Sequence, residues 1–132
     1  MSSVFTRILA GELTGRFVTQ DERCAAFLTI APIRPGHVLV VPRIEVDDWL
    51  DLDPGLAAHL TVVAQRVGQA VQQVTGAGRV ALIIAGFEVP HVHLHVLPAD
   101  TMADLDFRRA DADADPAALD LMRDRLLAAL DA

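Results

Sequence analysis

Apolar residues follow a helical spacing in two long segments of the chain. In the first, Asp53 and Pro54 combine an N-cap residue with a first-turn proline, and apolar residues then recur every three or four positions until Gly76. This pattern predicts one long helix. In the second, Pro116 opens a shorter amphipathic helix at the C-terminal end. A short helical turn is also expected over residues 4–9.

Five other segments are rich in apolar and β-branched residues and have the length of strands, with Pro, Gly or polar corners between them. The expected strands are 17–18, 25–30, 37–41, 79–85 and 91–97. They cluster before and after one helix, with no regular alternation of strand and helix. The pattern therefore predicts an α+β fold, with a mainly antiparallel sheet of about five strands, one long central helix and a C-terminal helix.

One domain accounts for the length of the chain. Its 132 residues suffice to bury a core, and a hydrophobic share of 52% against 22% charged residues excludes disorder for the body of the protein. We expect residues 1–110 to form the main domain. Residues 111–132 are expected to be an acidic linker and a helix packed on that domain.

Net charge and cysteine usage restrict the partners and the compartment. The net charge of -7 argues against nucleic acid, although a local site can still bind an anionic small molecule. The apolar runs are too short to cross a bilayer or to serve as a signal peptide, so no membrane partner is expected. Cys24 is the only cysteine, which leaves no disulfide or thiolate zinc site within one chain. A reducing, cytoplasmic location is expected.

The candidate chemistry lies in the segment His91-Val92-His93-Leu94-His95. Side chains on a strand alternate between faces, so the three imidazoles are expected on one face, about 7 Å apart, with the apolar residues on the other. Burying three imidazoles without partners would cost stability. Something is therefore expected to meet them.

Three interpretations of this cluster compete. The imidazoles are ordinary surface histidines, or they bind a metal together with a carboxylate from Glu88 or Glu45. Alternatively they surround a phosphoryl group, where one neutral imidazole attacks phosphorus and its neighbours donate hydrogen bonds to the oxygens. We favour the third interpretation.

Three segments resemble the histidine triad (HIT) family. Residues 91–97 match its signature His-φ-His-φ-His-φ-φ, where φ is apolar, at every position. Residues 35–42 resemble the second recurrent segment of the family, and residues 5–12 resemble its N-terminal opening. The resemblance covers roughly residues 4–98, in the same order and with similar spacing, which is more specific than a triple histidine alone.

The resemblance implies a role for each histidine. His93 corresponds to the nucleophile that attacks an α-phosphorus and forms a nucleotidyl-histidine intermediate, which water then resolves. His95 and His37 would hydrogen-bond the phosphate, and His91 would orient His93 and hold its tautomer. His95 stands where the nucleotidyl-transferase branch has Gln, which indicates hydrolysis.

The resemblance also implies a substrate pocket. Its expected residues are Phe5, Ile8, Phe27, Thr29, Ile30, Leu39, Phe87 and Glu88. Core packing explains each apolar one of these equally well. Three positions depart from the family pattern. Thr29 replaces an Asp or Asn at the ribose, and Phe87 and Glu88 replace polar residues of the phosphate loop.

No cofactor or metal is expected. The zinc site of some family members corresponds to Ser3, Thr6, Glu45 and His91, of which only the histidine is a good zinc ligand. Because the family commonly pairs two sheets about a two-fold axis, a homodimer is expected.

The expected function is a nucleotide phosphohydrolase or phosphoramidase that acts on a small-molecule nucleotide through a nucleotidyl-histidine intermediate. Two other classes stay open. One is a non-catalytic nucleotide sensor, because Phe87 and Glu88 are unusual in a phosphate loop. The other is a metal-dependent hydrolase.

Overall fold

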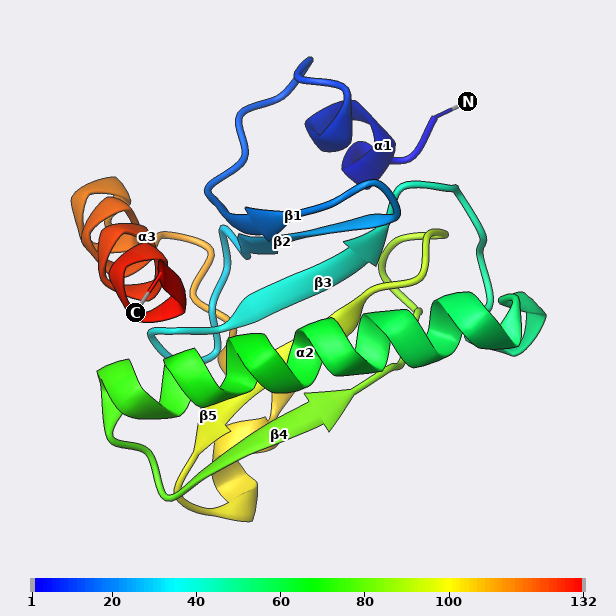
Figure 1. Ribbon diagram of the computed structural model, residues 1–132. Coiled ribbons are helices and arrows are strands. Elements are labelled where there is room, and N and C mark those ends of the chain that lie inside the picture. The colour runs from blue at the N-terminus through cyan, green and yellow to red at the C-terminus, as the bar shows by residue number, and fades with distance from the viewer. Residues whose placement is uncertain (1, 132) are drawn as a thin grey trace.

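A single antiparallel sheet organises the computed structural model, which describes residues 2–131 (Figure 1). Its strand order is β1-β2-β3-β5-β4, and every neighbouring pair is antiparallel. The strands are β1 (Phe17–Gln20), β2 (Cys24–Leu28), β3 (Val38–Pro42), β4 (Arg79–Ile83) and β5 (Leu94–Ala99). This confirms the predicted α+β fold and its five-stranded sheet.

The predicted long helix is confirmed as α2 (Pro54–Thr75), which lies across one face of the sheet (Figure 1). The Asp53 carboxylate accepts the N–H of Leu56 at its start, and Gly76 ends it in the left-handed conformation. The C-terminal helix α3 (Pro116–Asp131) packs against α2 and β1, with Leu126 fully buried. Four short helices complete the fold: α1 (Val4–Leu9), η1 (Trp49–Asp51), η2 (Met102–Leu105) and η3 (Phe107–Arg109).

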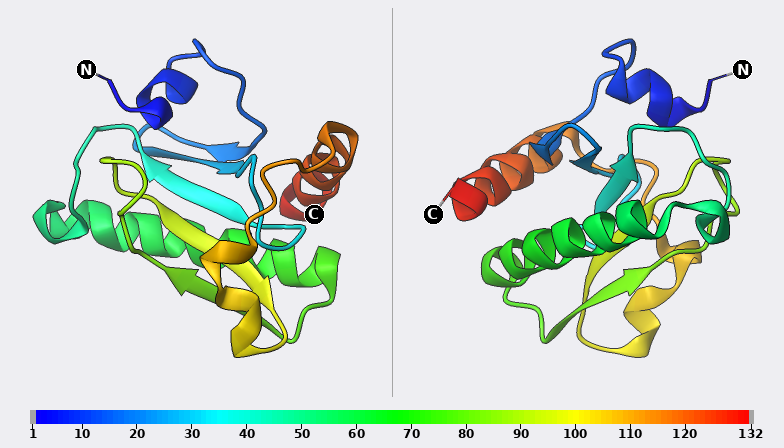
Figure 2. Two further views of the ribbon diagram at one scale, coloured as in Figure 1. Left: turned by 180° about the vertical axis from the view of Figure 1, so that it is seen from behind. Right: turned by 45° about the vertical axis from the view of Figure 1, so that its right-hand side comes forward.

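The core is divided between the two faces of the sheet. On β3, Val38 and Val40 belong to the large apolar cluster that packs under α2. Leu39 and Val41 alternate with them and pack on the opposite face with Phe5 of α1. The view from behind shows that η2 and η3 lie away from α2 (Figure 2). One face is thus sealed by a long helix, and the other is covered only by short elements.

The turn before β3 requires a glycine. Gly36 has a φ of 98°, and an added Cβ there would lie 2.9 Å from Cγ2 of Thr75 at the end of α2. Both the backbone conformation and the close approach exclude a side chain. This turn delivers His37 to the first position before β3.

The predicted strand over 91–97 begins later than expected. Its ladder with β3 starts at the pair Val40–Leu94, so His91 and His93 lie in an irregular segment before β5. In that segment the N–H of Val92 donates to the carbonyl of Val46, at 2.7 Å, in place of a neighbouring strand. The alternation of side chains nevertheless persists, because Val92 packs in the cluster under α2.

The ends of other strands also differ from the predicted ones, because a strand ends where its pairing with the neighbouring strand ends. The strand predicted over 25–30 ends at Leu28, which pairs with the first residue of β3. The strand predicted over 79–85 ends at Ile83 opposite His95. The strand predicted over 37–41 runs one residue later, as β3.

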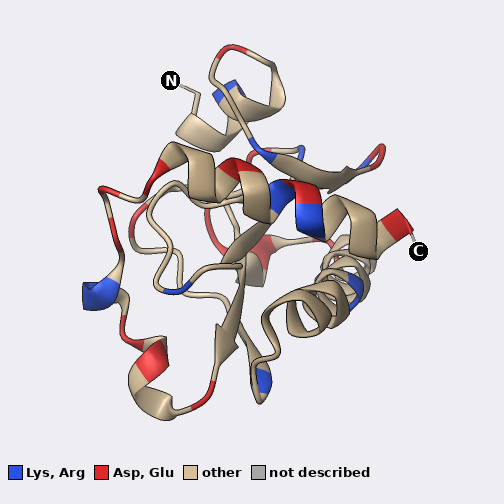
Figure 3. Ribbon diagram, turned by 90° about the vertical axis from the view of Figure 1, so that its left-hand side faces the viewer, with Lys and Arg blue, Asp and Glu red and all other residues tan. Residues whose placement is uncertain are grey.

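The surface is acidic without a single charged face. Figure 3 shows Asp and Glu spread over several loops and helices, with Arg scattered among them. Within residues 2–131, no helix has both the length and the apolar character needed to span a membrane.

Candidate active site

A cavity of about 640 Å³ lies on the face of the sheet opposite α2. It is large enough for a nucleotide-sized ligand. Its lining comes from α1 and the residues after it, the loop before β3, β3 itself, the segment before β5, β5 itself, and η3. The lining residues are Val4, Phe5, Ile8, Leu13, Thr14, Thr29, Ile30, Ala31, Ile33, His37, Leu39, Glu88, Val89, His93, His95, Phe107 and Ala110.

His93 is held in one tautomer by the backbone. Its Nδ1 lies 2.7 Å from the carbonyl oxygen of His91, and because a carbonyl can only accept, Nδ1 carries the proton. In the neutral ring this leaves the lone pair on Nε2 of His93, which is the form that a nucleophile needs. The expectation that His91 fixes this tautomer agrees with the geometry, but the group involved is the His91 carbonyl and not its imidazole.

His37 and His95 form a directed chain of hydrogen bonds. The N–H of Ile33 donates to Nδ1 of His37, at 3.2 Å, so the proton of His37 lies on Nε2. That Nε2–H donates to Nδ1 of His95, at 2.9 Å. Nε2 of His95 consequently carries a proton. Within residues 2–131 it is the single buried side-chain nitrogen or oxygen without a hydrogen-bond partner. The site thus holds a buried donor that awaits an acceptor.

Burial keeps these imidazoles neutral. It lowers the pKa of His37 to about 3 and that of His95 to about 4, and it also lowers the pKa of His91. The neighbouring His93 ring adds to the lowering for each of the three. All three are uncharged at neutral pH, which agrees with the tautomers that the hydrogen bonds require.

His91 is buried behind the cavity and does not line it. Its Nε2–H donates to the carbonyl of Pro42 at 2.8 Å, so its Nδ1 accepts from the Ser3 hydroxyl at 2.7 Å. With both ring nitrogens engaged, the His91 imidazole anchors the segment whose carbonyl orients His93. It acts as a positioning residue.

The four residues at the expected position of a family zinc site do converge. Glu45 accepts hydrogen bonds from the Ser3 backbone N–H, at 2.6 Å, and from the Thr6 hydroxyl, at 2.7 Å, while Ser3 also contacts His91. They satisfy one another, and two of them offer only neutral hydroxyls. This donor set does not fit zinc, and the contacts tie α1 to the histidine segment.

Six of the eight predicted substrate-binding residues line the cavity together. Phe5 lies edge-on to His93, with ring centroids 4.9 Å apart, and Ile8 and Leu39 extend the apolar wall. The Thr29 hydroxyl accepts the N–H of Ala31 at 3.2 Å. Ile30 is 71% exposed, so its apolar surface lies open at the cavity. Glu88 is the sixth.

Phe27 and Phe87 do not line this cavity. Phe27 is buried behind Phe5, with ring centroids 5.8 Å apart, and serves as core. Phe87 is 94% exposed and lies instead at a neighbouring hollow of about 420 Å³, which it shares with His93. Its ring is therefore not part of the cavity that holds His37, His93 and His95.

Glu88 contributes the charge of the site. Its Oε2 lies 3.5 Å from Nε2 of His93. Apart from the histidines, Glu88 is the one ionisable residue in the lining given above, which contains no Arg or Lys. The cavity therefore combines a free imidazole lone pair, an unpartnered N–H and a carboxylate, without a fixed positive charge.

Sequence reasoning missed Phe107. It lies in η3, after β5, and its ring stands edge-on to His95 at a centroid distance of 4.8 Å. It packs against His95 and forms part of the cavity lining. A lone aromatic residue between charged ones carries no periodic signal that indicates such a place.

The fold and the site define an α+β protein with a histidine-based, nucleotide-sized cavity. The HIT domain profile matches residues 10–102, and the chain belongs to the HIT family. An uncharacterised HIT-like protein of Mycobacterium tuberculosis is 36% identical over 103 residues, which are 74% of this chain and 72% of that protein.

A curated relative with a named activity and a solved structure extend the comparison. Bis(5'-nucleosyl)-tetraphosphatase of Schizosaccharomyces pombe is 39% identical over 79 residues, 56% of this chain and 43% of that protein. The crystal structure of a zinc-bound histidine triad family protein from Mycobacterium smegmatis has a TM-score of 0.84 at 30% identity, covering 99% of this chain and 94% of that one. The family thus includes nucleotide hydrolases.

Acidification should destabilise the protein between about pH 6.5 and pH 4, because the folded pKa values of His37 and His95 lie below the ordinary 6.5. In this window the unfolded chain binds more protons than the folded one. The free energy of unfolding should therefore fall as pH falls, by up to about 1.4 kcal/mol per pH unit for each imidazole. Denaturant titrations across the window measure the slope, and His37→Gln should flatten it. A pH-independent stability would contradict neutral, buried histidines.

Proposed function

We propose that this protein is a nucleotide phosphohydrolase or phosphoramidase that works through a covalent nucleotidyl-histidine on His93. One observation carries the proposal: the free Nε2 lone pair of His93 and the unpartnered Nε2–H of His95 belong to the same nucleotide-sized cavity. The two rings are 4.8 Å apart between centroids. A nucleophile beside a hydrogen-bond donor is the pair of groups that displacement at phosphorus needs.

In the proposed reaction, Nε2 of His93 attacks the α-phosphorus. A nitrogen–phosphorus bond forms, the bond to the leaving group breaks, and the leaving group departs with the bonding electrons. The Nε2–H of His95 donates to a phosphoryl oxygen that gains charge. Water then attacks the same phosphorus, releases the nucleoside monophosphate and restores His93. Positioning in the cavity supplies most of the rate enhancement.

The apolar wall of the cavity suits the nucleoside. Phe5, Ile8 and Leu39 provide a surface for a base, and the Thr29 hydroxyl is available to a sugar oxygen or hydroxyl. The name of the yeast relative, a bis(5'-nucleosyl)-tetraphosphatase, supports a nucleotide as the substrate class.

Glu88 favours a nitrogen leaving group over a polyphosphate. A polyphosphate places several negative charges beside this carboxylate, and the lining offers no Arg or Lys to offset them. Each like-charge contact at about 4 Å costs about 1 kcal/mol in water-like surroundings and more in a partly buried site. The nitrogen of a phosphoramidate instead takes a proton from solvent before its bond to phosphorus breaks, is cationic at that stage, and leaves as a neutral amine. The carboxylate attracts the protonated nitrogen and so favours this step. We therefore place nucleoside phosphoramidates first among the substrates.

A metal-dependent hydrolase is the second candidate, and one observation favours it. Ligand atoms of Glu88, His93 and His95 lie within 4.8 Å of one another. Against it, His95 presents an N–H at Nε2, which has to lose its proton before that atom can bind an ion. Activity that disappears with a chelator and returns with one added metal would favour this candidate.

Replacing His93 by Ala should abolish covalent catalysis. Release of AMP from an adenosine phosphoramidate should fall by about 10³-fold or more, because the nucleophile is lost. A rapid quench in alkaline denaturant, chosen because the histidine nitrogen–phosphorus bond is labile in acid, should give an adenylylated native protein by mass spectrometry, and none in the variant. Gln73→Ala, an exposed change on α2, serves as the control and should keep full activity. Binding of nucleotide without turnover in the native protein would instead indicate a sensor.

Glu88→Gln should change the substrate preference. Neutralising the carboxylate should raise kcat/KM for diadenosine tetraphosphate about 10-fold relative to the phosphoramidate, since one repulsive contact of about 1.4 kcal/mol disappears. Parallel steady-state assays of both substrates give the ratio. If the ratio of the two kcat/KM values is unchanged while activity still depends on His93, the proposed role of Glu88 is wrong and the role of His93 stands.

The proposal includes a homodimer formed through β4 and α2. β4 pairs only with β5 and is an edge strand, which is a natural place for a second chain to pair. A groove of about 730 Å³ between β4 and α2 includes the exposed apolar residues Val62 and Leu82. A second copy would cover both.

Leu82→Asp should therefore shift the protein from dimer to monomer. Light scattering should give twice the chain mass of 14.2 kDa for the native protein and a single chain mass for the variant. Leu121→Asp, at an exposed apolar site on α3, is the matched control and should remain dimeric. A native protein that is monomeric at high concentration would contradict this assembly.

A further inference from the structure

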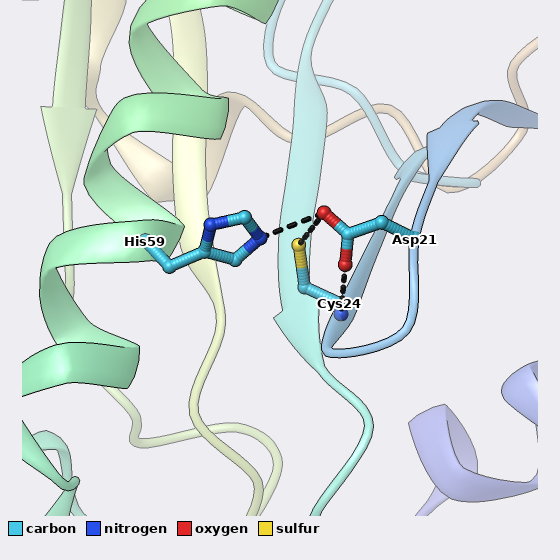
Figure 4. A group of neighbouring side chains, drawn as sticks. All are labelled: Asp21, Cys24 and His59. Carbon is cyan, nitrogen blue, oxygen red and sulfur yellow. Dashed lines mark hydrogen bonds and ion pairs between the residues drawn. The ribbon is translucent and has the colours of Figure 1, made fainter.

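A second cluster of potential metal ligands lies far from the nucleotide cavity, at the contact between the β1–β2 corner and α2. Asp21 lies in the corner, Cys24 begins β2, and His59 projects from the second turn of α2 (Figure 4). Cys24 packs in the core cluster on the α2 face of the sheet, whereas the cavity is on the opposite face.

The Asp21 carboxylate is the centre of this cluster. Its Oδ2 lies 2.7 Å from Nε2 of His59 and 3.8 Å from Sγ of Cys24 (Figure 4). Its Oδ1 accepts the backbone N–H groups of Arg23 and Cys24, at 2.8 and 2.9 Å. These two bonds fix the carboxylate and leave Oδ2 directed at the imidazole and the thiol.

The corner that carries Asp21 is itself braced. Nε of Arg43 donates to the Asp21 carbonyl at 2.7 Å, and the same guanidinium donates to the Gln20 side chain at 2.9 Å. Supporting contacts of this kind hold ligands in place around protein metal sites. His59 is accessible, with 23% of its side chain exposed, so an ion can reach the cluster from solvent.

A nucleophilic role for Cys24 does not fit. The thiol is 1% exposed, and burial raises its pKa to about 12, so it is protonated and shielded from reagents. The imidazole contacts the carboxylate and not the thiol, and the thiol donates to Asp21, whose charge holds the proton on the sulfur. What remains is three different ligand atoms, oxygen, sulfur and nitrogen, all within 4.8 Å of one another.

We propose that Asp21, Cys24 and His59 bind one divalent cation of the zinc class. Such an ion takes carboxylate oxygen, thiolate and imidazole nitrogen at about 2.0–2.3 Å, with water as a fourth ligand. It replaces the short His59–Asp21 hydrogen bond, and the Cys24 thiol releases its proton to solvent as the sulfur–metal bond forms. The bound ion fastens the β1–β2 corner to α2.

From the sequence, no thiolate zinc site is expected, because Cys24 is the only cysteine and no nearby residue indicates further ligands. The fold supplies them, because α2 crosses the sheet and brings His59 to a cysteine 35 positions earlier in the chain. A site built from one cysteine, one histidine and one aspartate has no short sequence motif that identifies it.

Cobalt(II) titration of the full chain tests the proposal, because thiolate ligation produces an intense near-ultraviolet charge-transfer band. All titrations use the His93→Ala background, which removes one ligand of the Glu88–His93–His95 group. One equivalent of cobalt should produce the band. Cys24→Ala should eliminate it, and His59→Gln should weaken cobalt binding at least about 10-fold. Gln73→Ala, on the same helix, should leave the titration unchanged.

Zinc should displace the cobalt and raise the midpoint of thermal unfolding by roughly 5 °C at a hundredfold excess over Kd. The His59→Gln variant should lose this rise in the midpoint. Because His59 is partly exposed, this variant is expected to fold, and it tests the proposal even if Cys24→Ala does not fold. The absence of the charge-transfer band in the His93→Ala protein, with Asp21, Cys24 and His59 intact, would overturn the proposal. So would a thermal shift that survives His59→Gln.

Discussion

Four imidazoles buried together impose the constraint on which the site depends. A buried imidazole is costly to charge, and burial lowers the pKa of His37, His91 and His95, so each of these three rings is neutral and has one nitrogen that donates and one that accepts. The partners of the rings must therefore be arranged in a consistent order. In this protein the order starts from the backbone: the Ile33 N–H fixes His37, the His91 carbonyl fixes His93, and the Pro42 carbonyl fixes His91.

The backbone origin of this order explains why short irregular segments matter as much as the histidines. The Gly36 turn places Ile33 beside His37, and the hydrogen bond from Val92 to Val46 holds the segment before β5 where no neighbouring strand pairs with it. α1 reaches the same segment through Ser3, which fills the remaining position on His91. The protons are thus distributed by the path of the main chain.

Periodicity in the sequence predicted which side chains share a face, and it did so correctly for α2 and for the alternation of His91, His93 and His95. It did not predict where β5 begins, because a strand ends where its partner ends, and that depends on sheet order. Periodicity also could not predict the place of Phe107 or the cluster around Asp21, for a related reason. Both arise from contacts between elements distant in the chain, and neither leaves a repeat in the sequence.

The hydrogen bonds that run from Ile33 through His37 to His95 have one direction, and this direction decides which ligand groups His95 can bind. Because the series begins at an amide N–H that cannot surrender its proton, it cannot be reversed without breaking a link. Nε2 of His95 can therefore donate a hydrogen bond to a ligand but cannot accept one. His95 therefore selects groups that offer a lone pair, such as phosphoryl oxygens, and Glu88 is left as the group of this cavity that can bind a protonated nitrogen.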